Sequence, residues 1–461
     1  MTQLQPEGSP GPLSPPGRDL LPGMRVVMDA RPLQDPGRGP ATARYLDRLL
    51  AAFDAEPLPG ESFTFLLQSD LDDPTTDLTR LEVVGRRLLP PTRLLRSGAL
   101  TVDPFLLRGA SLGAAWRADR SGAAGAVYHA VAGAPPLLSR IPIVVTLLDL
   151  APWELPGAFQ RAPASRFGQR LRGRLVRDAA AVLVGSEAVA KAARRVLRLR
   201  PGRIHVVPLA PHPAYAAIGL AAARAAAGAT GAGRDALDVP VNPVTELTRR
   251  TTEERTRLGL PERYLVYFGR FDARHDVATL LRSLAALGSQ PRPRGLSASD
   301  WPPRVLIVGA SPDDRASLAR AAGRVGAGDA LVYAPAMPPE RLASLVRGAR
   351  AVVMPAISDA SGLPAIDAIA AGVPVVATGV GALPEAVGQA GILVEPRDAS
   401  RLAEAIRTAW ADDRVRGRLV EAALGRAGAG ARTWADVALE TRRVYADVGV
   451  RRAAGLTDPA G

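Results

Sequence analysis

The stretch that decides the fold runs from Ala351 to Asp367 and reads AVVMPAISDASGLPAID. Its first four apolar residues predict a buried strand that ends at Pro355, and the residues after Gly362 predict a helix. An uninterrupted apolar strand followed closely by a helix is typical of a parallel sheet covered on both faces. The stretch therefore predicts an α/β domain with a ligand site at the carboxyl end of this strand.

The loop after this strand suits a ligand that carries both phosphate and hydroxyl groups. Gly362 permits close approach of the backbone to a ligand. The helix that opens at Leu363 and Pro364 offers N–H groups and a positive dipole end to a diphosphate. Because a phosphate repels carboxylates, Asp359 and Asp367 are expected to bind hydroxyls of a sugar or a ribose. Taken locally, a turn cap at Asp359 and an ordinary first-turn acid at Asp367 fit equally well.

A second loop in this half of the chain carries cations. The predicted strand Tyr264–Phe268 ends at Gly269, and Arg270, Arg274 and His275 follow before the next helix. Two arginines at this place are able to hold a diphosphate as it gains charge on leaving. In an arginine-rich chain, two solvated surface arginines are the alternative.

The alternation of apolar strands and helices extends over two separate parts of the chain. Residues 24–215 and 256–430 each predict a doubly wound, Rossmann-like domain, and the two are expected to face each other across a cleft. Residues 1–23, rich in Pro and Gly, predict a disordered N-terminal tail. Residues 216–255 predict a linker or insertion. Residues 431–461 predict a C-terminal helix that packs back toward the N-terminal domain, followed by a tail.

In the N-terminal half, the residues expected to face the cleft follow predicted strands. Gly39 belongs to a glycine-containing turn that matches neither the dinucleotide nor the Walker phosphate motif. His129 and Asp149 each end a strand, where ligands of open α/β sheets bind. A buried histidine with satisfied hydrogen bonds is the alternative for His129. Ser186 is predicted to cap the helix that follows strand Ala181–Gly185.

The composition excludes several classes of protein. The chain has no cysteine, which excludes disulfides, thiolate metal sites and cysteine nucleophiles. The four histidines match no zinc motif, and Asp70–Asp73 is expected to be a solvated turn, so no metal is predicted. The net charge of +13 permits a phosphate-bearing substrate, an anionic membrane or nucleic acid. With 4% aromatic residues we do not predict nucleic-acid binding.

Taken together, these segments resemble the GT-B glycosyltransferases of family 4, the glycosyltransferase group 1 type. Ser358–Thr378 resembles the family's pattern of a Glu, seven residues, a second Glu and then Ala-Met-Ala-x-Gly-x-Pro-Val-Val. Phe268–Phe271 is similar to the family's Gly-Arg-Leu/Phe turn. Shorter segments, from Ala30–Pro32 to Val206–Ala210, are similar to family segments in the same order. The similarity extends from Met24 to the end of the chain, apart from the insertions.

The resemblance implies a retaining, mannosyltransferase-like enzyme that needs no metal or other cofactor and binds a GDP- or UDP-sugar on the C-terminal domain. Asp359 would contact the donor sugar, Asp367 the ribose and Arg270 the diphosphate. Both family glutamates are aspartates here, each shorter by one carbon–carbon bond of about 1.5 Å. The family's usual lysine is replaced by His275, so Arg274 is expected to supply the second cation.

The resemblance also places a glycan, lipid-linked or small-molecule acceptor on the N-terminal domain, near Gly39, His129, Asp149 and Ser186. Two rival functions stay open: a catalytically degenerate binding or scaffold protein of the same fold, and a GT-B epimerase or hydrolase. We expect a cytoplasmic protein, since no run approaches the roughly 18 apolar residues of a membrane span. The basic helix Lys191–Arg203 leaves peripheral contact with the inner face of the membrane open, beside an ordinary surface helix.

Overall fold

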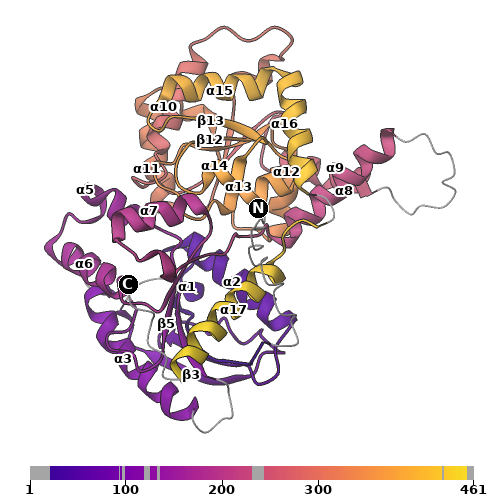
Figure 1. The fold of residues 1–461 in the computed structure, drawn as a ribbon. Helices are drawn as coiled ribbons and strands as arrows, with labels where there is room; N and C mark the ends of the chain where they lie inside the picture. Colours follow the sequence, from indigo (N-terminus) through magenta and orange to yellow (C-terminus); the bar gives the residue numbers. More distant parts are fainter. Residues whose placement is uncertain are drawn as a thin grey trace, which may run out of the picture.

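In the computed structural model of the chain, two parallel sheets, each covered by helices, form two domains that meet along one face (Figure 1). The described residues are 21–92, 94–95, 99–118, 125–131, 135–230, 243–427 and 430–453. The tail predicted for residues 1–23 lies outside these ranges except for its last residues, 21–23.

The N-terminal sheet has seven strands in the order β3-β2-β1-β4-β5-β6-β7, and all neighbouring strands are parallel. The strands are β1 Arg25–Asp29, β2 Ser62–Gln68, β3 Val83–Leu89, β4 Ala126–Ala130, β5 Ile143–Thr146, β6 Ala181–Val184 and β7 Ile204–Val206. The helices are α1 Arg31–Gln34, α2 Pro40–Ala55, α3 Ala99–Ala118, α4 Ala151–Glu154, α5 Pro156–Phe159, α6 Pro163–Arg177 and α7 Glu187–Leu197, with a short 3-10 helix at Pro201–Arg203. Strand order reverses between β1 and β4, which is where such sheets bind ligands.

The C-terminal sheet repeats this design with six parallel strands in the order β10-β9-β8-β11-β12-β13. The strands are β8 Leu265–Phe268, β9 Val305–Val308, β10 Leu331–Tyr333, β11 Ala351–Met354, β12 Val375–Thr378 and β13 Gly391–Val394. The helices are α10 Val277–Gly288, α11 Pro312–Arg324, α12 Pro339–Gly348, α13 Leu363–Ala370, α14 Leu383–Val387, α15 Ala399–Ala411 and α16 Asp413–Arg426, with 3-10 turns at Ala298–Asp300 and Gly328–Ala330. The order reverses between β8 and β11, so the loops after these strands share one crevice.

The segment between the domains differs from the prediction. Of residues 216–255, those that the structure describes are not an irregular linker but parts of two helices, α8 Pro213–Thr230 and α9 Pro243–Arg257. Alanine is the strongest helix former, which accounts for the start of α8. Helix α8 packs against α12, α13 and α16 of the C-terminal domain. At Gly219, an added Cβ would lie 1.6 Å from the carbonyl oxygen of Ala370, so this contact requires glycine.

The last helix, α17 Trp434–Ala453, returns to the N-terminal domain and lies along α2 (Figure 1). Arg442 on α17 forms a buried ion pair with Glu61 at 2.6 Å. Tyr445 donates to or accepts from Nδ1 of His129 at 2.6 Å. The chain therefore crosses between the domains twice, once before α8 and once before α17.

Candidate active site

A pocket opens between the two domains at the carboxyl ends of the strands that flank each reversal of strand order. The start of α2 and the end of β5 line it on the N-terminal side, and the loops after β8 and β11 line it on the C-terminal side. The predicted site residues that line this pocket are Gly39, Asp149, Gly269, Arg270, Arg274, His275, Asp359, Leu363 and Pro364. Residues from four distant segments thus meet at one place, as parallel sheets require of their strand ends.

Asp359 holds the loop before α13 in shape. Its Oδ1 accepts the N–H of Ser361 at 2.9 Å, the N–H of Gly362 at 2.8 Å and the hydroxyl of Ser361 at 3.2 Å. Gly362 has φ +62, a left-handed conformation that glycine adopts without strain. Among the described residues, Oδ2 of Asp359 has no hydrogen-bond partner. One oxygen therefore caps the turn, and the other is free for a ligand in the pocket.

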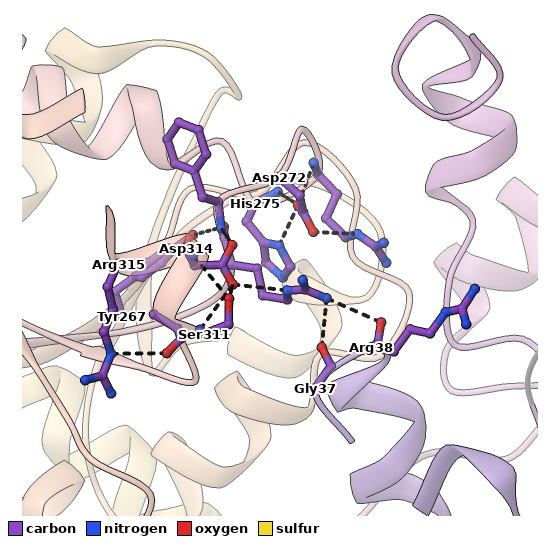
Figure 2. A network of polar contacts seen from close by, with 12 residues as sticks. Gly37, Arg38, Tyr267, Asp272, His275, Ser311, Asp314 and Arg315 are labelled. Carbon is purple, nitrogen blue, oxygen red and sulfur yellow. Dashed lines mark hydrogen bonds and ion pairs between the residues drawn. The ribbon is translucent and has the colours of Figure 1, made fainter. Parts of the chain in front are cut away.

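Arg270 joins the two domains across the pocket. Its Nη1 donates to the carbonyl of Gly37 at 2.8 Å, and its Nε lies 3.3 Å from Oδ2 of Asp314 at the start of α11. Figure 2 shows this network between Asp314 and the Gly37–Arg38 backbone. Although burial opposes it, hydrogen bonds from Ser311 and Phe271 hold the pKa of Asp314 below its usual value. Asp314 is therefore an anionic partner for Arg270.

Arg274 also bridges the domains. Its Nη1 lies 2.7 Å from Oδ2 of Asp149, which follows β5, and its guanidinium lies over the ring of Phe159. Asp272 accepts from the backbone N–H of Arg274 at 3.0 Å and bonds Nδ1 of His275 at 2.7 Å. Burial raises the pKa of Asp272, but the hydrogen bonds and charge of His275 together with the charge of Arg274 outweigh it and leave that pKa below its usual value. Both arginines predicted to bind diphosphate are thus paired in this structure.

Asp367 has a different environment from Asp359. Arg48 on α2 grips its carboxylate with two hydrogen bonds, of 3.0 Å to Oδ1 and 2.6 Å to Oδ2. The backbone N–H of His212 donates to Oδ1 at 2.8 Å. Both side chains are only 6% exposed, and Asp367 does not line the pocket. The structure gives Asp367 an interdomain ion pair that the sequence did not reveal, and a contact with ribose would require this pair to open.

The prediction that His129 faces the cleft is wrong. His129 lies within β4 and its side chain is fully buried, with Nε2 2.7 Å from Oγ1 of Thr146 and Nδ1 bonded to the hydroxyl of Tyr445. Burial lowers the pKa of His129 to about 3. The histidine is therefore a neutral core residue, the alternative that its sequence position left open.

We expect His129 to make the protein less stable in mild acid. Between pH 6.5 and its folded pKa of about 3, the unfolded chain binds a proton that the folded chain does not. The free energy of unfolding should therefore decrease as the pH is lowered through this range. His129 contributes about 1.4 kcal/mol of this decrease per pH unit. Urea unfolding from pH 6.5 to about pH 4 measures this slope. The variant His129→Gln, which keeps polar groups but does not titrate, should show a shallower slope, and equal slopes would contradict the expectation.

The prediction that Ser186 caps the following helix is confirmed, but Ser186 does not line the pocket. Its Oγ accepts the N–H of Val189 at 3.2 Å, which caps α7. The remaining first-turn N–H groups of α7 are bound by Glu385 of the C-terminal domain, which accepts from Ala188 at 2.6 Å and from Glu187 at 3.1 Å. Ser186 borders a separate hollow between the domains. It therefore belongs to the domain interface beside the pocket.

Residues 262–412 match the family model described as glycosyl transferases group 1. The D-inositol 3-phosphate glycosyltransferase of Acidothermus cellulolyticus is 35% identical over 182 residues, which are 38% of this chain and 39% of that protein. The chain thus spans less than half the length of this curated relative. Among solved structures, sucrose-phosphate synthase of Thermosynechococcus elongatus aligns over 94% of this chain and 100% of its own, with a TM-score of 0.62 and 19% identity. Anabaena Alr3699/HepE, solved in complex with UDP-glucose, aligns over 92% and 98%, with a TM-score of 0.57 and 16% identity.

The C-terminal domain is a glycosyltransferase group 1 domain. The chain as a whole has the GT-B fold, since the structural alignments cover nearly all of it. All the C-terminal residues predicted for the donor, from Gly269 to Asp367, lie inside the part that matches the group 1 family. In the described part of the chain, no helix of this group 1 glycosyltransferase domain or its partner domain is long and apolar enough to span a membrane.

Sequence reasoning missed three residues that border the pocket or hold its walls together. Arg44 on α2 lines the pocket, and Ser358 after β11 donates to Glu154 at 2.6 Å across the domain interface. Asp314 anchors Arg270 from the start of α11. Arg44 and Tyr45 form one of the shorter segments that are similar to the family, and this similarity was the available signal. The roles of Ser358 and Asp314 depend on partners far away in the sequence.

Proposed function

We propose that this protein is a glycosyltransferase that takes a sugar from a GDP- or UDP-sugar and transfers it, with retention of configuration, to a hydroxyl-bearing acceptor. The observation that carries this proposal is the interdomain pocket that combines Asp359, the start of α13 and the cations Arg270 and Arg274. The name of the curated relative supports a glycosyltransferase, and the UDP-glucose complex of HepE supports a nucleotide-sugar donor.

In this proposal the C-terminal side of the pocket stabilises the departing diphosphate. Arg270 and Arg274 would exchange their present carboxylate partners for phosphate oxygens, a geometry that guanidinium groups fit well. The positive dipole end of α13 adds positive potential at the same place. These groups supply charge stabilisation without a metal, so we propose no metal cofactor. Oδ2 of Asp359 would accept a hydrogen bond from a hydroxyl of the donor sugar.

We place the acceptor on the N-terminal side, near Gly39 and Asp149. Asp149 follows the carboxyl end of β5 and pairs with Arg274. If donor binding breaks this ion pair, the Asp149 carboxylate becomes available to an acceptor hydroxyl. The contacts that join the domains would exclude water from the closed pocket, which protects the donor from hydrolysis. A glycan, a lipid-linked sugar or a small phosphorylated polyol fits this description, the last supported by the relative's name.

Isothermal titration calorimetry against UDP, GDP and their sugars tests the donor. We expect one nucleotide class to bind with Kd well below 1 mM, an affinity of roughly 5–8 kcal/mol. If no nucleotide and no nucleotide sugar binds at millimolar concentration, the proposed function is wrong. Product analysis with the bound donor then separates the rival reactions: sugar transferred only when an acceptor is present supports a transferase. Free sugar or an epimer formed without an acceptor would identify a hydrolase or an epimerase.

A further inference from the structure

The side chain of Glu385 connects the two domains through backbone groups. Glu385 lies on α14 of the C-terminal domain, and its carboxylate reaches the start of α7 in the N-terminal domain (Figure 1). Its Oε1 accepts the N–H of Ala188 at 2.6 Å, and its Oε2 accepts the N–H of Glu187 at 3.1 Å. Within the N-terminal domain, Ser186 caps the next N–H, that of Val189. The positive end of α7 therefore binds a carboxylate that the other domain supplies.

Helix α14 and the residue before it also pack against residues 359–362, which we call the Asp359 turn. The N–H of Ala382 donates to the carbonyl of Asp359 at 2.8 Å. An added Cβ at Gly362 would lie only 3.2 Å from the Cβ of Ala386 and 3.4 Å from that of Ala382. These contacts leave little room between α14 and the turn, so a displacement of α14 displaces the turn with it.

The shape of the Asp359 turn decides what the pocket presents to a ligand. Oδ1 of Asp359 holds the N–H groups of Ser361 and Gly362, and this arrangement leaves Oδ2 for the pocket. On the opposite side of α14, Glu385 is exposed. Its contact with α7 is therefore able to break and re-form without leaving a buried charge unpaired. One short helix thus contacts the other domain with a side chain and the Asp359 turn with its backbone and small side chains.

We propose that Glu385 is a positioning residue for the donor sugar. By holding α14 against α7, its carboxylate keeps the Asp359 turn in the shape that presents Oδ2 to the pocket. Without this carboxylate, water binds the first N–H groups of α7, and α14 is free to shift together with the turn. The part that the turn takes in sugar transfer rests on the proposed function, whereas the coupling between Glu385 and the turn does not.

Amide hydrogen exchange of the full chain, measured by mass spectrometry on peptides that contain the Asp359 turn, tests the coupling. We expect Glu385→Ala to raise the exchange rate of the turn about tenfold, because the turn opens more often. Glu385→Gln keeps an oxygen that accepts the N–H groups of α7, so its rate should lie within about threefold of the parent.

Ser186→Ala is the matched control for this measurement. It removes a cap from the same end of α7, but it leaves the contact between the domains in place. It should therefore speed exchange at the start of α7 and leave the Asp359 turn at the parent rate. If Glu385→Ala leaves the turn at the parent rate, or if Ser186→Ala loosens the turn as much as Glu385→Ala does, the coupling is overturned.

Transfer rates, measured with the donor that calorimetry identifies, test whether Glu385 acts through Asp359. We expect Glu385→Ala to lower the rate about tenfold in the parent but less than twofold in Asp359→Asn, where the oxygen that it positions has already lost its charge. Glu404→Gln, whose side chain is 69% exposed on α15, should leave both rates unchanged. Equal losses in the two backgrounds would overturn the positioning role. If the parent binds no nucleotide, the proposed function fails, and hydrogen exchange alone decides the coupling.

Discussion

Replacing Arg48 with Met should destabilise the closed arrangement of the two domains by about 3–5 kcal/mol, the usual cost of leaving one member of a buried ion pair alone. The carboxylate of Asp367, 6% exposed, would then keep only the N–H of His212 as a hydrogen-bond donor. Urea unfolding measures the loss of stability, and small-angle X-ray scattering measures whether the radius of gyration increases as the domains separate.

The control for this prediction is an exposed pair of the same chemistry. Arg401 and Glu404 on α15 are each 69% exposed, so Arg401→Met should change the free energy of unfolding by no more than about 1 kcal/mol. The double variant Arg48→Met, Asp367→Leu should recover much of the loss, because apolar residues of similar size replace a buried pair well. If Arg48→Met behaves like Arg401→Met in both measurements, the pair does not hold the domains together.

Replacing Asp359 with Asn should lower the rate of sugar transfer about 10- to 100-fold while the fold is retained. The amide oxygen of Asn still accepts the N–H groups of Ser361 and Gly362, which now bind Oδ1 at 2.9 and 2.8 Å. The variant removes only the charge that the proposed function assigns to a hydroxyl of the donor sugar. A hydrogen bond to a charged group contributes about 1.5–3 kcal/mol, which gives the stated range of rates. Nucleotide release from the donor that calorimetry identifies measures this rate.

Asp398→Asn is a matched control, because Asp398 caps α15 through the N–H of Arg401 at 2.9 Å and lies outside the pocket. Its activity should equal that of the parent, and both Asn variants should melt near the parent temperature. A rate for Asp359→Asn within about twofold of the control would show that this carboxylate does not act on the donor. If the variant also fails to bind nucleotide, the defect lies in donor binding and not in the transfer step.

Much of the fold was predictable from local pattern. The strand Ala351–Met354 and its neighbours are short apolar runs, and the parallel, doubly covered sheets that they predict are confirmed. Strand β3 was missed because it is an edge strand with exposed arginines and no continuous apolar run. Helices α8 and α9 were missed because their glycines and prolines suggested a linker, whereas packing on the C-terminal domain stabilises α8.

The sequence by itself determined which residues stand at the carboxyl ends of the strands. Asp359, Arg270 and Arg274 follow β11 and β8, which are neighbours in the sheet, so a local pattern was enough to bring them together. Only the tertiary structure decided what each of them touches. Asp367 meets Arg48 from 319 positions away, and no local pattern encodes a contact at that separation. It depends on how the two sheets dock, and that docking also places Arg44 of the N-terminal domain over the ring of Phe268 in the pocket.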